Sequence, residues 1–353
     1  MRSKLIFVSA FLLLLAGCGG SAPSASPGDS ITEVTSQQSL DDLTKAAKEE
    51  GDVTWYTSIP SERANQIGSM FKKKYGIEVL VLRSGGSDIL QKFLLEEEAG
   101  RVKNDVLTIT DPAAFINLKA EDKLTCFKPG AFDSVPDYAK DPDGCWIASR
   151  VNAYVIAYNT KKITDPPTSF DDLADPRFAD ELGYVNPNFS SGALVATAAL
   201  AKYKGWDWVE KLAESGLLVV KGNNQLMQSV VTGERGIASF VNSTYVSEAK
   251  AAGQPIEWVF PEDGMLMLPA PSAVVAGAPN PSAGKLLANF LLTDEVQHVM
   301  VEDGNYAAIK QLPAPEGQPK AEDIKKMEVD FDELAKTGST VRDKFNSIVE
   351  KAK

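Results

Sequence analysis

Short β-rich runs alternate with amphipathic helical runs from residue 52 onward, and this alternation limits the fold more than any other feature. Residues 53–57 and 77–82 have strand character, and the residues between them carry apolar side chains at helical spacing. A third strand-like run follows at 105–109, and a second series begins near residue 182. Strands that alternate with helices form parallel or mixed sheets that helices cover on both faces. The chain is therefore predicted to be an α/β protein.

The order of these runs predicts two lobes, each built on a parallel or mixed sheet, with a ligand cleft between them. We expect residues 37–150 and 265–353 to form lobe 1 and residues 151–264 to form lobe 2. The chain then crosses between the lobes twice, at hinges near 151–158 and 256–264. The length of 353 residues agrees with two compact units of about 150 residues each.

The first 18 residues are typical of an export signal. Arg2 and Lys4 precede an almost wholly apolar run at 5–17, and Cys18 follows directly. A run of 13 residues is too short to cross a hydrocarbon layer of about 30 Å, but it has the length of a signal's apolar region. The segment resembles a bacterial lipoprotein signal that is cleaved before Cys18. A buried N-terminal helix that happens to end in Cys is the alternative.

Lipid on Cys18 anchors a protein to a membrane without spanning it. Residues 18–36 are rich in Ser, Ala, Gly and Pro, which is typical of a flexible tether. The expected location is therefore extracytoplasmic, with the folded body held by its lipid at the bacterial cell membrane.

Two further cysteines, Cys126 and Cys145, lie in the predicted exported body. Export permits oxidation, so we expect one disulfide between them. It closes a loop of about twenty residues and contributes about 3 kcal/mol in the chain-entropy model. Two free buried thiols are the alternative.

The charge of the chain excludes several classes of protein. There are 36 Lys and Arg against 48 Asp and Glu, a formal charge of −12, which disfavours nucleic-acid binding. His298 is the single histidine, which disfavours a Ser-His-Asp catalytic triad and a metal site built from histidines. An exported hydrolase that uses Asp111 or Glu262 as its base is a remote alternative, and no catalytic residue is assigned.

Small polar residues follow several of the predicted strands. In an open α/β sheet such loops gather at the carboxyl ends of the strands, where helices begin with free N–H groups. These loops suit a carboxylate, phosphate or phosphonate, although Ser and Asn are also ordinary helix caps. The candidate ligand-binding residues are Ser58, Ser84, Gly85, Ser87, Ser190, Ser191, Gly192, Ala193, Asn224, Asn242 and Tyr245.

Arg83 and Arg150 lie next to these loops and are candidate partners for an acidic ligand. Ion pairs on the surface are the alternative for both arginines. If either touches the ligand, the cleft carries positive charge although the whole chain is acidic.

Short motifs in a fixed order extend over most of the chain after the tether; they lie at 53–58, 71–77, 157–160, 171–176, 183–185, 261–264 and 294–297. Together they resemble the extracellular solute-binding proteins of ABC importers, in the group of ferric-ion-binding and phosphonate-binding proteins. The resemblance implies a two-lobed, type II periplasmic-binding-protein fold. It also implies a monomer without a cofactor, which delivers its solute to the permease and ATPase subunits of an importer.

The resemblance leaves two kinds of ligand open. Ferric binders of this group have two adjacent tyrosines where this chain has Thr244 and Tyr245, and often a histidine where it has Pro60. The helix start at Ser191 is similar to the stretch that holds a phosphate in some of them. We therefore expect a small anion that contains phosphate or phosphonate. The alternative is a ferric receptor in which Tyr245 and Tyr154 bind Fe(III) beside a synergistic anion.

Overall fold

A computed structural model describes residues 31–310 and 312–352. The predicted signal peptide, Cys18 and most of the predicted tether lie outside the described residues. Within the part that is described, no helix has the length and apolar character needed to cross a membrane.

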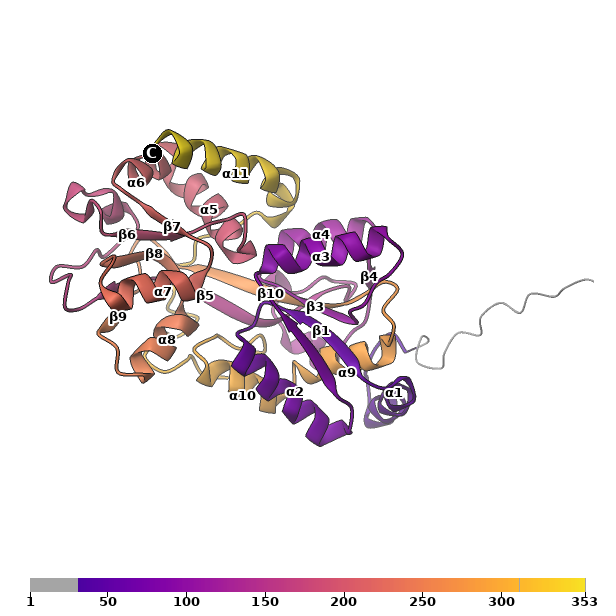
Figure 1. Cartoon of the computed structure of the whole chain (residues 1–353). Helices are drawn as coiled ribbons and strands as arrows, with labels where there is room; N and C mark the ends of the chain where they lie inside the picture. Colours follow the sequence, from indigo (N-terminus) through magenta and orange to yellow (C-terminus); the bar gives the residue numbers. More distant parts are fainter. Residues whose placement is uncertain (1–30, 311, 353) are drawn as a thin grey trace, which may run out of the picture.

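The described residues form a ten-stranded mixed sheet that extends through both halves of the molecule (Figure 1). The strand order is β2-β1-β3-β10-β5-β8-β6-β7, with β4 paired to β10 and β9 paired to β5. The strands are β1 (Val53–Thr57), β2 (Val79–Arg83), β3 (Val106–Thr108), β4 (Leu124–Thr125), β5 (Ile147–Asn159), β6 (Leu182–Val185), β7 (Leu218–Val220), β8 (Ile237–Asn242), β9 (Ile256–Val259) and β10 (Leu266–Val275). The predicted α/β class is confirmed. The two expected sheets are joined into one, because β5 and β10 pair with each other and with strands of both halves.

Helices cover the sheet in both halves (Figure 1). They are α1 (Gln37–Glu50), α2 (Ser61–Tyr75), α3 (Gly86–Glu98), α4 (Pro112–Ala120), α5 (Ser191–Lys204), α6 (Trp206–Glu214), α7 (Asn223–Thr232), α8 (Ser243–Ala251), α9 (Pro281–Phe290), α10 (Asp294–Glu302) and α11 (Phe331–Lys351). The apolar spacing seen in the sequence explains the burial of α2, whose Phe71 and Tyr75 rings meet Phe290 of α9. Gly76 ends α2 in a left-handed conformation, which glycine adopts without strain.

Within each half, the central strands run parallel. β1 is parallel to β2 and β3 in one half, and β6 is parallel to β7 and β8 in the other. The carboxyl ends of parallel strands lie at one edge of a sheet, so the loops after these strands come together. This arrangement brings the predicted loops of the two halves toward each other.

Three segments run between the halves. β5 and β10 are long, almost wholly buried antiparallel strands. The third connection is the chain between α10 and α11, in which Tyr306 exchanges backbone hydrogen bonds with Val151 at 2.9 and 3.0 Å. It is irregular apart from isolated bridges such as this one, so periodicity gives no sign of it.

The last helix contacts both halves. Residues 265–353 were assigned to lobe 1, and α11 packs against α4 of the first half and against α5 and α6 of the second. Its Phe345 ring stacks on Tyr184 of β6, with ring centroids 5.2 Å apart. The lobe boundaries stay a prediction.

The structure contains the predicted disulfide between Cys126 and Cys145. It joins the chain after β4 to the residue two positions before β5. The cross-link therefore ties the start of one connecting strand to the first half.

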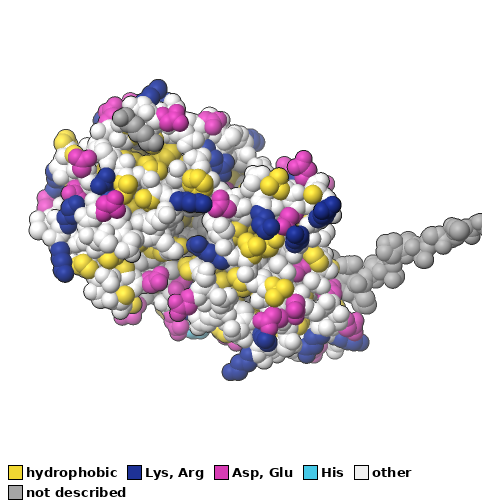
Figure 2. All heavy atoms as spheres, in the orientation of Figure 1, with side chains coloured by type: hydrophobic (Ala, Val, Ile, Leu, Met, Phe, Trp, Pro, Cys, Tyr) yellow, Lys and Arg dark blue, Asp and Glu magenta, His cyan; other side chains and the backbone are white. Residues whose placement is uncertain are grey.

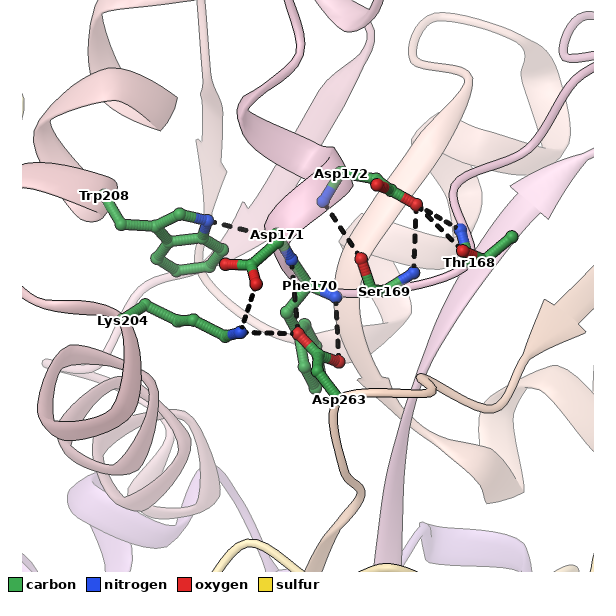
Figure 3. Close-up of polar contacts among 8 residues, drawn as sticks. All are labelled: Thr168, Ser169, Phe170, Asp171, Asp172, Lys204, Trp208 and Asp263. Carbon is green, nitrogen blue, oxygen red and sulfur yellow. Dashed lines mark hydrogen bonds and ion pairs between the residues drawn. The ribbon is translucent and has the colours of Figure 1, made fainter.

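A polar network fastens the turn before β10 to the second half (Figure 3). The Asp263 carboxylate accepts hydrogen bonds from the backbone N–H groups of Phe170 and Asp171, at 3.1 and 3.3 Å. Lys204, at the end of α5, lies 2.7 Å from Asp263 and 2.8 Å from Asp171. Trp208 of α6 donates to the carbonyl of Phe170 at 3.1 Å. Movement between the halves is therefore expected beyond this turn, in β5 and β10 themselves.

Candidate functional site

A cleft of about 310 Å³ lies between the two halves, where the parallel strands end. Figure 2 shows the hollow near the centre of this face, with Lys or Arg side chains beside it. Most of the residues expected at a ligand are among its lining: Ser58, Arg83, Ser84, Gly85, Arg150, Tyr154, Ser190, Ser191, Gly192, Asn224, Asn242 and Tyr245. Loops that are up to about 190 residues apart in the sequence therefore share one cavity.

Two of the predicted site residues are not among the lining residues of the cleft, Ser87 and Ala193. The backbone N–H of Ala193 donates to Ser190 Oγ at 3.2 Å and so takes part in the cap of α5. Ser87 lies in the first turn of α3 with its hydroxyl buried.

Five helices begin at this cleft: α2, α3, α5, α7 and α8. Ser190 Oγ caps α5, and Asn242 Oδ1 caps α8 by accepting the N–H of Thr244 at 3.1 Å. No side chain among the described residues caps the first turn of α2, α3 or α7. Helix N-termini carry partial positive charge and free N–H donors, so the cleft presents several donors to an anion.

The starts of α3 and α5 approach each other from opposite halves. A β-carbon at Gly85 would lie 2.5 Å from the carbonyl oxygen of Phe189, and one at Gly86 would lie 2.1 Å from Ser191 Oγ. A third glycine, Gly192, faces the hydroxyl of Tyr154, which a β-carbon would approach to 2.0 Å. This close approach requires glycine at all three positions.

Arg150 forms the buried, positively charged part of the cleft. It is 4% exposed, and its Nε donates to Asn152 Oδ1 at 3.1 Å. Asn152 in turn donates to Thr110 Oγ1 at 2.7 Å. Nη1 of Arg150 is buried and has no hydrogen-bond partner in the described part of the chain. Burial lowers the pKa of Arg150 to about 10, so the guanidinium is still charged at neutral pH and needs an anion.

A second guanidinium reaches the cleft from the other side of Tyr245. Arg83, at the end of β2, donates from Nη2 to the Tyr245 hydroxyl at 3.5 Å. Burial raises the pKa of Tyr245 and of Tyr154 above the ordinary value, so both side chains are neutral phenols at pH 7. The two phenols lie beside the two guanidinium groups.

Metal-binding groups are scarce in the described residues. These residues contain no cluster of three or more His, Cys, Asp or Glu that could hold a metal ion. Two further tyrosines, Tyr56 and Tyr158, are not among the lining residues of the cleft, and the Tyr56 hydroxyl lies 3.2 Å from Glu96. Tyr154 and Tyr245 are thus the tyrosines that reach the cleft in the described chain.

Five residues of the cleft carry polar chemistry that the sequence did not reveal: Asp88, Thr110, Lys221, Gln225 and Asn305. Thr110 and Lys221 follow β3 and β7, so the strand-end pattern that found the serines could have found them. Asn305 comes from the third connection, where Thr244 Oγ1 meets its side-chain oxygen at 3.1 Å. No local pattern marks Asn305.

Comparison with known proteins agrees with this geometry. Residues 103–337 match the family model described as "Bacterial extracellular solute-binding protein". The chain belongs to this family. It is therefore an extracytoplasmic solute-binding protein of ABC import and not an enzyme. Of the two residues considered as a hydrolytic base, Asp111 caps α4, and neither it nor Glu262 is among the cleft-lining residues.

Several relatives of this solute-binding protein can be compared with it. A Salmonella paratyphi A protein, provisionally named a 2-aminoethylphosphonate-binding periplasmic protein, is 28% identical over 308 residues, 84% of this chain and 81% of its own. Iron-bound HitA from Pseudomonas aeruginosa has a TM-score of 0.74 at 23% identity, covering 84% of this chain and 99% of its own. AfuA from Actinobacillus pleuropneumoniae, with fructose-6-phosphate bound, has a TM-score of 0.74 at 18% identity, covering 85% and 97%. The two structures confirm the predicted fold.

Proposed function

We propose that the cleft binds a small anion through a phosphate or phosphonate group and that the protein delivers it to a membrane permease. The observation that carries this proposal is the buried Arg150, which lines the cleft and whose Nη1 has no hydrogen-bond partner among the described residues. A buried guanidinium N–H without a hydrogen-bond partner is costly, and an anion at this position would remove that cost. Phosphonate oxygens also fit the uncapped N–H groups of α2, α3 and α7.

The relatives support a ligand of this class. One is named for 2-aminoethylphosphonate, and the AfuA structure holds a sugar phosphate. Both ligands carry a phosphorus-containing anionic group, although the sequence identity of either protein to this chain is low. The common chemistry agrees with the donors that the cleft provides.

Ferric iron is the second candidate, because Tyr154 and Tyr245 line the same cleft and HitA binds iron. Phenols bind Fe(III) as phenolates, and burial raises the pKa of these two, so the loss of their protons costs more than for an exposed tyrosine. Arg83 and Arg150 also place positive charge where the metal ion would lie. The charges of the cleft therefore favour an anion as the transported solute.

Calorimetry on the ligand-free protein distinguishes a phosphorus-containing anion from ferric iron as the solute. We expect binding of alkylphosphonates or sugar phosphates, and a loss of about 10- to 100-fold in affinity in Arg150→Met, since a charge-assisted hydrogen bond disappears. The control is Arg177→Met, at an arginine that pairs with Asp165 and is not a lining residue of the cleft. Two results together would refute the proposal. Neither alkylphosphonates nor sugar phosphates would give heat of binding, and addition of Fe(III) would give a tyrosinate colour that Tyr245→Phe abolishes.

The lipid anchor is part of the same proposal. Cys18 follows an apolar run with the length of a signal peptide, and the body begins only after a Ser-, Gly- and Pro-rich segment. Metabolic labelling with a radioactive fatty acid should mark the wild type, and Cys18→Ser should be unlabelled and released from the membrane fraction. Membrane retention of the unlabelled variant would contradict lipidation at Cys18.

A further inference from the structure

The cleft has opposite charges at different depths. Among the described residues that line it, Asp88 is the one carboxylate, while Arg83, Arg150 and Lys221 are cationic. The Asp88 side chain, in the first turn of α3, is 37% exposed, whereas Arg150 is 4% exposed. The buried part is therefore positive, and a negative group lies near the solvent.

The Asp88 carboxylate already lies close to an ammonium group. Lys221 reaches across from the other half and places Nζ 3.7 Å from Asp88 Oδ2. The same Nζ lies 4.8 Å from the centroid of the Phe189 ring, and Ser84 Oγ donates to Asp88 at 3.3 Å. A carboxylate and an aromatic face together form a binding environment for a primary ammonium.

A ligand can displace Lys221 from Asp88 and Phe189. The Lys221 side chain is 59% exposed, and exposed ion pairs contribute little to stability. Asp88 also favours the start of α3 through the helix dipole, as acids in first turns do. That role explains neither the lysine from the opposite half nor the position of its ammonium over Phe189.

We propose that Asp88 and the ring of Phe189 form an ammonium subsite at the solvent side of the cleft, which Lys221 occupies when no ligand is bound. The solute is then a zwitterion, with a phosphonate or phosphate at Arg150 and a primary amine at Asp88. A cleft of about 310 Å³ has room for a short chain between the two groups. This inference rests on the proposed function and extends it to the second end of the ligand.

Two probes of nearly equal shape test the subsite. 2-Aminoethylphosphonate carries an ammonium where n-propylphosphonate carries a methyl group, so the ratio of their dissociation constants isolates the ammonium. We expect the wild type to bind the amino compound about tenfold more tightly, as one partly exposed charge pair with a ring contact implies. Asp88→Asn should bring the ratio close to one. Lys221→Met should raise it above the wild-type value, because a competing ammonium is gone.

The matched control is Asp207→Asn, which removes an acid from the first turn of α6 and should keep the wild-type ratio. An Asp88→Asn protein that retains the wild-type ratio would overturn the subsite. So would a Lys221→Met protein whose ratio falls below the wild-type value. Failure of the wild type to bind either phosphonate would instead overturn the proposed function, and the subsite with it.

Discussion

At the scale of single residues, the buried carboxyl of Asp111 makes the stability of the fold depend on pH. Asp111 is 3% exposed and caps α4 by accepting the N–H of Ala114 at 3.1 Å. Burial raises its pKa to about 6, although Arg342 of α11 attracts its charge. Between about pH 4 and pH 6 the folded state keeps a proton that the unfolded state has released. This group therefore lowers the stability as the pH rises through that window.

Asp111→Asn tests this effect, since Asn also caps helices but carries no charge. We expect the free energy of unfolding at pH 7 to rise by about 2–3 kcal/mol, and to change little at pH 4. Urea unfolding at both pH values measures the difference. Asp330→Asn makes the same replacement at the exposed cap of α11 and is the matched control. A variant that is no more stable than the wild type at pH 7 would contradict the role of burial.

Local rules predicted some cleft residues and could not predict others. Ser58, Ser84 and Ser190 were expected because each follows a strand, and a strand end is visible in a short stretch of sequence. The contact between Asp88 and Lys221 joins residues 133 positions apart and depends on how the halves face each other. Nη1 of Arg150 lacks a hydrogen-bond partner in the described part of the chain because the residue is buried in the folded protein, and a short stretch of sequence does not show this.

At the scale of elements, the meeting of α3 and α5 couples the geometry of the cleft to two helix starts. Gly86→Ala would place a methyl group 2.1 Å from Ser191 Oγ, so the starts of the two helices would have to move apart. We expect phosphonate affinity to fall by about tenfold or more, and the ligand-free protein to unfold at a lower temperature, because the two helix starts pack against each other in it. Calorimetry and thermal unfolding separate these effects.

The control for this change is Gly338→Ala in α11, where a β-carbon would meet only Leu194 at 3.7 Å. That variant should bind as the wild type does and unfold at an equal or higher temperature. Wild-type affinity in Gly86→Ala would show that the contact between α3 and α5 is not needed for binding.

Elements with regular periodicity were predicted well, and irregular segments were not. The strands at β1 and β8 and the helix at α2 follow from alternation and helical spacing. The third connection has no such pattern, because isolated bridges such as those at Tyr306 and Lys326 hold it to the sheet. The assignment of α11 to lobe 1 followed from sequence order, which does not show that the helix also packs against α5 and α6.

At the scale of the whole molecule, a continuous sheet and three connections join the halves. The cleft takes residues from both halves, including Arg83 from β2 and Tyr245 from α8. A ligand bound there contacts both halves and stabilises them together. We therefore expect one thermal transition in the ligand-free protein and one, at a higher temperature, in the complex.

Mass action sets the size of this shift. A ligand at 100 times its dissociation constant adds about 2.7 kcal/mol, which for a chain of this length raises Tm by roughly 4 °C. Differential scanning calorimetry over a series of phosphonate concentrations measures it, and Arg150→Met should need about 10- to 100-fold more ligand for the same shift. Sodium chloride at equal ionic strength controls for a general salt effect. Two transitions, of which the ligand moves only one, would show that a single half holds the solute and that the halves unfold independently.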